Sequence, residues 1–126
     1  MEQPCKQGKG KLWRKVLLAD GAFDDDAPPA RIHGDLWAGN VVFTDEGVVL
    51  IDPAAHGGHR LTDLAMLALF GTPQLKTILS EYAEAARLDP DFTDLVGLHQ
   101  LHPLLVHAVS HGPSYGHEAG EVARRY

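Results

Sequence analysis

The chain has 126 residues, of which 44% are hydrophobic, and a formal net charge of −6 with histidine neutral. This length is enough for one domain with a hydrophobic core, and the negative charge argues against nucleic acids and anionic membranes as main partners. A single cysteine, Cys5, can form no internal disulfide, and no apolar run suits a signal peptide or a membrane-spanning helix, so a cytoplasmic protein is expected.

The first 30 residues are predicted to form a short helix followed by a linker. Apolar residues at positions 12, 13, 16 and 17 recur at helical spacing, with basic residues on the remaining surface. Three consecutive aspartates at 24–26 and two prolines at 28–29 interrupt regular structure, so residues 21–30 are expected to be exposed. The chain is therefore divided into residues 1–30, an N-terminal helix with an acidic, proline-containing linker, and a lobe of residues 31–126.

Residues 31–52 carry the clearest functional pattern. Apolar residues at 41–44 and 48–51 flank a polar turn at 45–47, which predicts a β-hairpin. Asp35 and Asn40 stand five positions apart, the interval that protein kinases use for a catalytic aspartate and a magnesium-binding asparagine. Since the two strands run in opposite directions over about the same length, the hairpin should return Asp52 to the side of Asn40. The three residues therefore predict a phosphoryl-transfer site.

Each residue of this stretch also has a structural interpretation. Asp35 could merely brace a turn, but Asn40 and the aspartate after the hairpin together favour a functional site. We expect Asp35 to orient and deprotonate an acceptor hydroxyl, and Asn40 and Asp52 to bind Mg²⁺, an ion that prefers oxygen ligands. His33 is expected to brace the loop by hydrogen bonds rather than to transfer protons.

Three further residues are candidates for the surroundings of the site. Trp37 has two open interpretations: it stacks on a sugar or lines the acceptor pocket, or it is a core aromatic residue. Arg60 and Asp63 are expected to form a structural pair or a helix cap that supports the catalytic loop. A carboxylate in the first turn of a helix, the position predicted for Asp63, also suits the helix dipole.

The remaining chain is predicted to be mostly helical, which gives an α+β fold class. Residues 53–60 form a glycine-rich loop, and residues 61–70, apolar nearly all round, form a buried helix. An amphipathic helix is expected at 74–87. Asp91 is expected to cap a third helix, which Pro103 should kink or split, and Ser114 is expected to cap the last one.

Eight histidines raise the alternative of a second metal site. His107 and His111 are four positions apart, and His99 and His102 three apart, so each pair can share one face of a helix. No cysteine, and no carboxylate at matching spacing, completes a zinc site. The sequence alone therefore favours core or surface histidines.

Three segments of the lobe match a known group of enzymes. They read HGDLWAGN at 33–40, IDPA at 51–54 and GGHRLTDLAML at 57–67, and residues 70–71 and 102–107 extend the match. These segments resemble the fructosamine kinase (ketosamine kinase) family, within the larger group of aminoglycoside-phosphotransferase and protein-kinase-like enzymes. The resemblance covers roughly residues 29–126 and implies the C-terminal lobe of a protein-kinase-like fold, with a small β-hairpin carrying the catalytic loop.

The resemblance also implies an activity and its cofactors. The family transfers the γ-phosphoryl group of ATP to a sugar hydroxyl of a glycated amine or protein lysine, with Mg²⁺ as the metal. In such an enzyme Asp35 looks like the catalytic base, and Asn40 and Asp52 look like the magnesium ligands through which the nucleotide is bound.

The sequence departs from the family in one large respect. Such kinases have an N-terminal lobe with a strand-borne lysine, a partner glutamate and a loop over the phosphates, and residues 1–30 are too short to supply it. The chain therefore looks like the catalytic lobe alone. The alternative function is an inert fragment or interaction module that does not bind ATP by itself. Because the face left open around residues 35–52 is apolar, self-association is expected.

Overall fold

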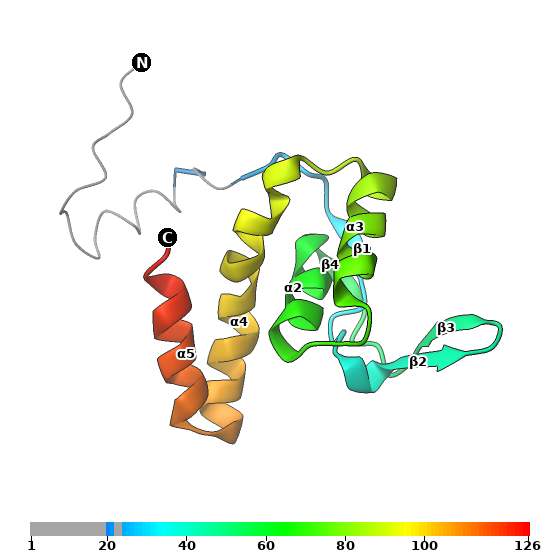
Figure 1. Ribbon diagram of the computed structural model, residues 1–126. Helices are drawn as coiled ribbons and strands as arrows, with labels where there is room; N and C mark the ends of the chain where they lie inside the picture. Colours follow the sequence, from blue (N-terminus) through cyan, green and yellow to red (C-terminus); the bar gives the residue numbers. More distant parts are fainter. Residues whose placement is uncertain (1–19, 22–23) are drawn as a thin grey trace, which may run out of the picture.

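The computed structural model describes residues 20–21 and 24–126, so the helix predicted at 12–17 lies outside the described residues. The described chain consists of four α-helices, two short 3-10 helices and two small antiparallel sheets. Figure 1 shows the helices side by side, with one pair of β-strands extending beyond them as a hairpin. The predicted α+β class, dominated by helix, is therefore confirmed.

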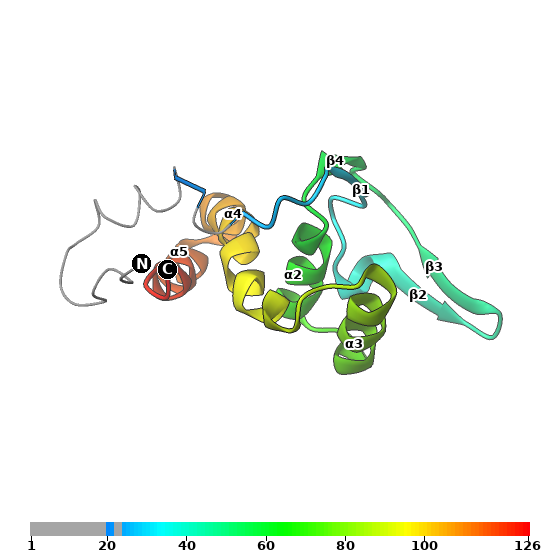
Figure 2. The same ribbon diagram turned by 90° about the horizontal axis from the view of Figure 1, so that it is seen from above.

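The predicted β-hairpin is present. Strand β2 (Val41–Thr44) pairs antiparallel with β3 (Gly47–Leu50), so that Val41 lies opposite Leu50. The 3-10 helix η1 (Ala38–Asn40) leads directly into β2. Figures 1 and 2 both show the hairpin extending away from the helices, and all of β3 is exposed.

The expectation of a plain loop at 53–60 was wrong, because this segment contains strand β4 (His56–Gly58). It pairs antiparallel with β1 (Ala30–Ile32), with Ala30 opposite Gly58. Two glycines give no strand signal in the sequence. The strand forms because β1 supplies a partner, and a Cβ atom on Gly58 would lie 2.9 Å from Cδ1 of Ile32. A side chain at Gly58 would therefore require the buried Ile32 side chain to shift.

Helix α2 (Leu61–Phe70) is the central helix of the described chain and packs against α4 (Thr93–His111). Four of its residues are buried: Leu61, Leu64, Ala65 and Leu67. Helix α4 then packs along α5 (Pro113–Ala123) around a core of Leu104, Ala119 and Val122. The Tyr126 hydroxyl donates to the Asp94 carbonyl at 2.5 Å, which ties the end of the chain to the start of α4.

Three details of the helices differ from the sequence prediction. Helix α4 begins at Thr93, after the 3-10 helix η2 (Pro90–Phe92), so Asp91 does not cap it. Helix α5 begins at Pro113, whose fixed φ suits the first helical position, so Ser114 is already inside. Helix α4 runs through Pro103 without being split. Pro103 and its neighbour Leu104 are buried, and this packing offsets the backbone hydrogen bond that proline removes.

Helix α3 (Leu75–Ala86) has the predicted amphipathic stripe, but none of its residues is buried. Its Ile78 and Tyr82 face one side of the hairpin across a cavity of about 440 Å³, to which Phe43 and Val48 also contribute. The opposite side of the hairpin carries Val42 and Val49, at 40% and 49% exposure. In the described part of the chain no helix has both the length and the apolar content needed to cross a membrane.

Candidate active site

The loop that follows β1 is held in place by a residue of α2. The Asp63 carboxylate accepts two backbone hydrogen bonds, from His33 N–H at 2.7 Å and from Gly34 N–H at 3.0 Å. Asp63 lies in the first turn of α2, so the helix fixes where the loop leaves the strand. Because both carboxylate oxygens are used on successive amides, the backbone at 33–34 has one orientation relative to α2.

Gly34 allows this loop to pass close to the segment after the hairpin. Its φ is +84°, in the left-handed region that favours glycine. A Cβ atom at this position would lie 2.3 Å from the Ala54 carbonyl oxygen. Any other residue would therefore push the loop away from residues 51–54, the segment that carries Asp52.

The His33 side chain joins the same two segments. Its Nε2 lies 2.8 Å from the Ile51 carbonyl oxygen, and its Nδ1 lies 3.3 Å from the backbone nitrogen of Asp35. A carbonyl can only accept and a backbone N–H can only donate, so the neutral ring carries its proton on Nε2. His33 thus links the residue before Asp52 to the backbone of Asp35.

Asn40 lies against Asp35, as their spacing suggested. Its Nδ2 donates to the Asp35 backbone carbonyl at 2.8 Å and to the Asp35 carboxylate at 3.2 Å. Asn40 is only 6% exposed, the one buried polar residue among those described. Since the amide nitrogen makes both bonds, the side-chain oxygen Oδ1 is left to accept from, or coordinate, another group.

Asp52 follows directly on the segment that pairs with Asn40. The Ile51 N–H donates to the Asn40 carbonyl at 3.0 Å, so the hairpin returns the chain to the end of η1. Asp52 itself has φ +50°, a left-handed conformation that marks the turn out of the hairpin. Its carboxylate is exposed and accepts no hydrogen bond within the described part of the chain.

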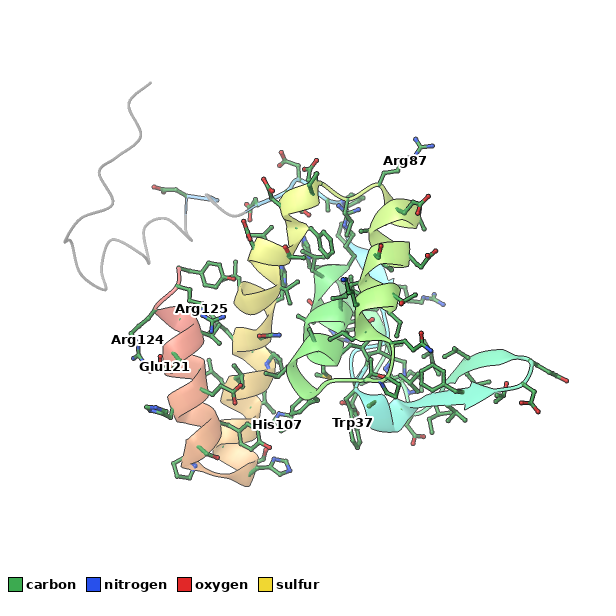
Figure 3. All side chains as sticks on the ribbon, viewed as in Figure 1. Trp37, Arg87, His107, Glu121, Arg124 and Arg125 are labelled. Carbon is green, nitrogen blue, oxygen red and sulfur yellow. The ribbon has the colours of Figure 1, made fainter. Side chains whose placement is uncertain are left out.

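Trp37 is not a core residue. Its side chain is 44% exposed, and Figure 3 shows it projecting from the loop at the foot of the hairpin. The ring lies so close to Gly39 that a Cβ atom there would be 2.2 Å from the indole Cη2. The sequence did not identify Gly39, yet glycine at this position is what lets the indole lie flat against the loop.

The expected pairing of Arg60 with Asp63 is not what the structure shows. Among the described residues, Arg60 forms its ion pair with Asp25, at 3.5 Å from Nη2 to Oδ2. Asp25 also accepts from His59 Nε2 at 3.0 Å, while His59 Nδ1 accepts from the Leu61 N–H at 3.1 Å. The segment before β1 is therefore attached to the start of α2 rather than only exposed, as the linker was expected to be.

Two perturbed titratable groups lie at this attachment. The hydrogen bond from His59 lowers the pKa of Asp25. His99, on α4, stacks on His59 with ring centroids 4.3 Å apart, and burial lowers the pKa of His99, with the nearby His59 adding to the effect. Both groups lie outside the loop at 33–40. Their protonation therefore affects the contacts that join the segment before β1 to α2 and α4.

The oxygen ligands present are of the kind that magnesium uses. No three His, Cys, Asp or Glu side chains in the described residues come together as a metal site. The predicted ligands are instead one amide, Asn40, whose Oδ1 has no hydrogen-bond role here, and one carboxylate, Asp52. Mg²⁺ is commonly held by one or two such side chains together with substrate phosphates. The chemistry of this amide and this carboxylate therefore fits a magnesium ion.

The chain matches one protein-family model and several curated proteins. The sequence model for "Fructosamine kinase" matches residues 14–126. A probable ketoamine kinase of Enterococcus faecium is 37% identical over 101 residues, which cover 78% of this chain and 35% of that protein. The ketosamine-3-kinase of Mus musculus is 35% identical over 107 residues, which cover 83% of this chain and 34% of the mouse protein. The chain thus spans about a third of the length of these curated relatives.

Two crystal structures resemble the fold. A Thermobifida fusca protein with a provisional fructosamine-3-kinase assignment is 51% identical, with a TM-score of 0.81 over 90% of this chain and 39% of that one. A Haemophilus somnus protein with the same provisional assignment matches with a TM-score of 0.69 over 92% of this chain and 40% of that one. At 23% identity the second comparison supports the fold alone.

Proposed function

The chain belongs to the fructosamine kinase family, and from this membership we propose that it is the catalytic lobe of an ATP-dependent phosphotransferase. The transferred group would be the γ-phosphoryl group, and the acceptor a sugar hydroxyl of a glycated amine. The names of the curated relatives, ketoamine kinase and ketosamine-3-kinase, support this substrate class. The negative net charge and the absence of a spanning helix in the described residues are consistent with a cytoplasmic enzyme that binds neither nucleic acid nor membrane.

Asp35 is the proposed catalytic base. Its carboxylate is half-buried, and one oxygen, Oδ2, receives a hydrogen bond from Asn40. The other oxygen, Oδ1, is available to accept the proton of an acceptor hydroxyl. His33, Gly34 and Asp63 hold the backbone around Asp35, so this oxygen is presented in a fixed direction rather than by a mobile loop.

Asn40 and Asp52 are the proposed ligands of Mg²⁺, and through it of ATP. The bound ion would neutralise charge on the phosphate oxygens of the nucleotide. Asn40 contributes an oxygen whose position is fixed by the two bonds of its own amide nitrogen. Asp52 contributes a carboxylate that is free of other hydrogen bonds within the described chain.

Trp37 is the proposed contact for the acceptor sugar. It lies two residues after Asp35, and its exposed ring rests against Gly39 instead of entering the core. An aromatic face on a rigid support offers a stacking surface for a sugar ring next to the base.

The observation that carries the proposal is the contact between Asn40 and Asp35, because it joins a carboxylate base and an oxygen ligand in one small site. The test is a calorimetric titration of this chain with Mg-ATP, with Asp52→Asn and Asp35→Asn variants alongside. We expect saturable binding that Asp52→Asn abolishes and that Asp35→Asn leaves within about threefold, since Asp52, unlike Asp35, is a proposed ligand of the metal. Binding that survives Asp52→Asn would show that the assignment of roles is wrong.

A second candidate function is an inert fragment or an interaction module. The observation in its favour is that the chain spans about a third of its curated relatives, so most of their length has no counterpart here. The same titration separates the two functions. No heat of binding at millimolar nucleotide would favour the interaction module over the enzyme.

A further inference from the structure

His107 and His111 form a stacked pair on α4, away from the loop that carries Asp35. They are one helical turn apart, and their rings lie with centroids 4.9 Å apart and planes 20° apart. Phe70 and Tyr115 pack against the His107 ring at 5.0 Å and 5.3 Å between centroids. Figure 3 labels His107 near the end of α4 that leads into α5. The proposed kinase mechanism uses neither histidine.

The hydrogen bond of His107 fixes which ring nitrogen carries the proton. Its Nδ1 lies 2.7 Å from the backbone carbonyl oxygen of Pro103, one turn earlier on the same helix. A carbonyl can only accept, so Nδ1 must donate. In the neutral ring the lone pair then belongs to Nε2.

His111 has the same tautomer, for a reason that involves one more residue. Its Nδ1 lies 2.7 Å from Oγ of Ser110, and that hydroxyl donates its single hydrogen to the Val106 carbonyl at 2.9 Å. With its hydrogen used, Ser110 Oγ can only accept from His111, so Nδ1 again carries the proton. Both rings therefore leave an Nε2 lone pair without a hydrogen-bond partner among the described residues.

We propose that His107 and His111 bind one divalent transition-metal ion, such as Zn²⁺, Ni²⁺ or Cu²⁺, through their two Nε2 atoms. Imidazole suits these ions, and metal-binding histidines characteristically donate their other ring N–H to a carbonyl or similar acceptor, as both do here. Spacing of four residues on a helix brings the two side chains within reach of one ion.

The site is an open one. No third His, Cys, Asp or Glu completes a metal cluster within the described chain, so water would fill the remaining coordination positions. An ion held by two side chains is expected to exchange freely and to bind in the micromolar range, in contrast to a closed structural zinc site. The sequence alone did not favour this pair as a metal site, because no cysteine and no carboxylate at matching spacing completes it; spacing also does not reveal which ring nitrogen is free.

The test is a zinc titration of the tag-free chain at pH 7.5, followed by calorimetry and by the NMR shifts of the histidine rings. We expect one ion per chain, bound in the micromolar range, with shifts confined to His107 and His111. The His111→Gln variant, on an exposed position, should weaken binding at least tenfold, and His107→Gln should do the same if its fold is confirmed by circular dichroism. His102→Gln on α4 and His117→Gln on α5 are matched controls, both exposed, that should change the affinity less than twofold.

Two results would overturn the proposal. One is the absence of saturable zinc binding below millimolar concentration. The other is a control variant, His102→Gln or His117→Gln, that weakens binding as much as His111→Gln. In either case the pair is a packing contact between α4, α2 and α5 and nothing more.

Discussion

Asp63 accepts two hydrogen bonds from a loop that lies 29 and 30 positions earlier in the chain. Such a contact cannot be read from local sequence, although the position of Asp63 near a helix start marked it as a supporting residue. The same is true of Asp25, whose partners His59 and Arg60 come more than thirty residues later. For individual residues, the sequence therefore predicts the candidate site residues, and the structure identifies the distant residues whose hydrogen bonds fix their position.

Replacing Asp63 by asparagine should destabilise the protein measurably. The amide offers one acceptor oxygen in place of two and turns an NH₂ group toward a backbone N–H, so one of the two loop amides loses its partner. The expected loss is about 1–3 kcal/mol of unfolding free energy, measured by urea denaturation. Glu81→Gln, an exposed substitution on α3, is the matched control and should change stability by less than about 0.5 kcal/mol. An equal effect of both substitutions would contradict the anchoring role of Asp63.

The stability should fall with acid in two steps. Burial holds the pKa of His99 below its usual value of 6.5, so the unfolded chain takes up this proton first and stability falls as the pH drops below about 6.5. The hydrogen bond from His59 holds the pKa of Asp25 below its usual value of 3.8, so its contribution is present above pH 3.8 and is lost as the pH falls through the lower, folded value.

Urea unfolding between pH 8 and pH 3 measures both steps. His99→Gln should remove the loss that begins below pH 6.5, because the glutamine cannot titrate, while the exposed His117→Gln should leave it unchanged. Asp25→Asn should remove the second step alone. A profile that His99→Gln does not alter would show that another group causes the first step.

Among the elements, the hairpin was predictable from two apolar runs on either side of a polar turn, and the helices from their apolar content and spacing. Helix α2 and helix α3 came close to their predicted bounds: Gly71 follows the end of α2, and Leu88-Asp89-Pro90 follows the end of α3. Strand β4 was missed because its pairing with β1 is a tertiary contact and its glycines carry no signal. The caps at Asp91 and Ser114 were misplaced because Pro90 and Pro113 begin their helical turns instead.

Helix α3 is the element expected to open most readily. None of its residues is buried, whereas four residues of α2 are, and the cavity of about 440 Å³ lies on its apolar side. Few buried apolar contacts give a low free energy of local opening. In native-state hydrogen exchange we therefore expect the amides of α3 to exchange at least tenfold faster than the interior amides of α2. Equal protection of the two helices would mean that α3 is packed more firmly than its burial indicates.

For the molecule as a whole, the exposed apolar residues of the hairpin point to self-association, which remains a prediction. Val42 and Val49 lie opposite each other on the side of the hairpin away from the cavity, and Leu50, which lines the cavity, is also 51% exposed. Surfaces of this kind are usually covered by another protein surface. The chain spans about a third of the length of its curated relatives. In a purified sample, the surface that can cover the exposed hairpin is that of a second copy of the chain.

Sedimentation velocity over a range of concentrations measures this association. We expect the mean sedimentation coefficient to rise with concentration, and Val49→Lys on the hairpin to return the chain to the monomer value. Val109→Lys is the matched control, because Val109 is 92% exposed and lies on α4 rather than on the hairpin. A strictly monomeric wild-type chain, or dispersal by Val109→Lys and not by Val49→Lys, would contradict an interface at the hairpin.

The position of Trp37 gives the protein a reporter of its own. An indole that is 44% exposed and rests on Gly39 is open to solvent on one side, so its fluorescence should change when a sugar or nucleotide displaces water from that face. The chain has only one other tryptophan, Trp13. With Trp13 changed to phenylalanine, the emission spectrum of a single residue would follow ligand arrival beside Asp35 in real time, without any added dye.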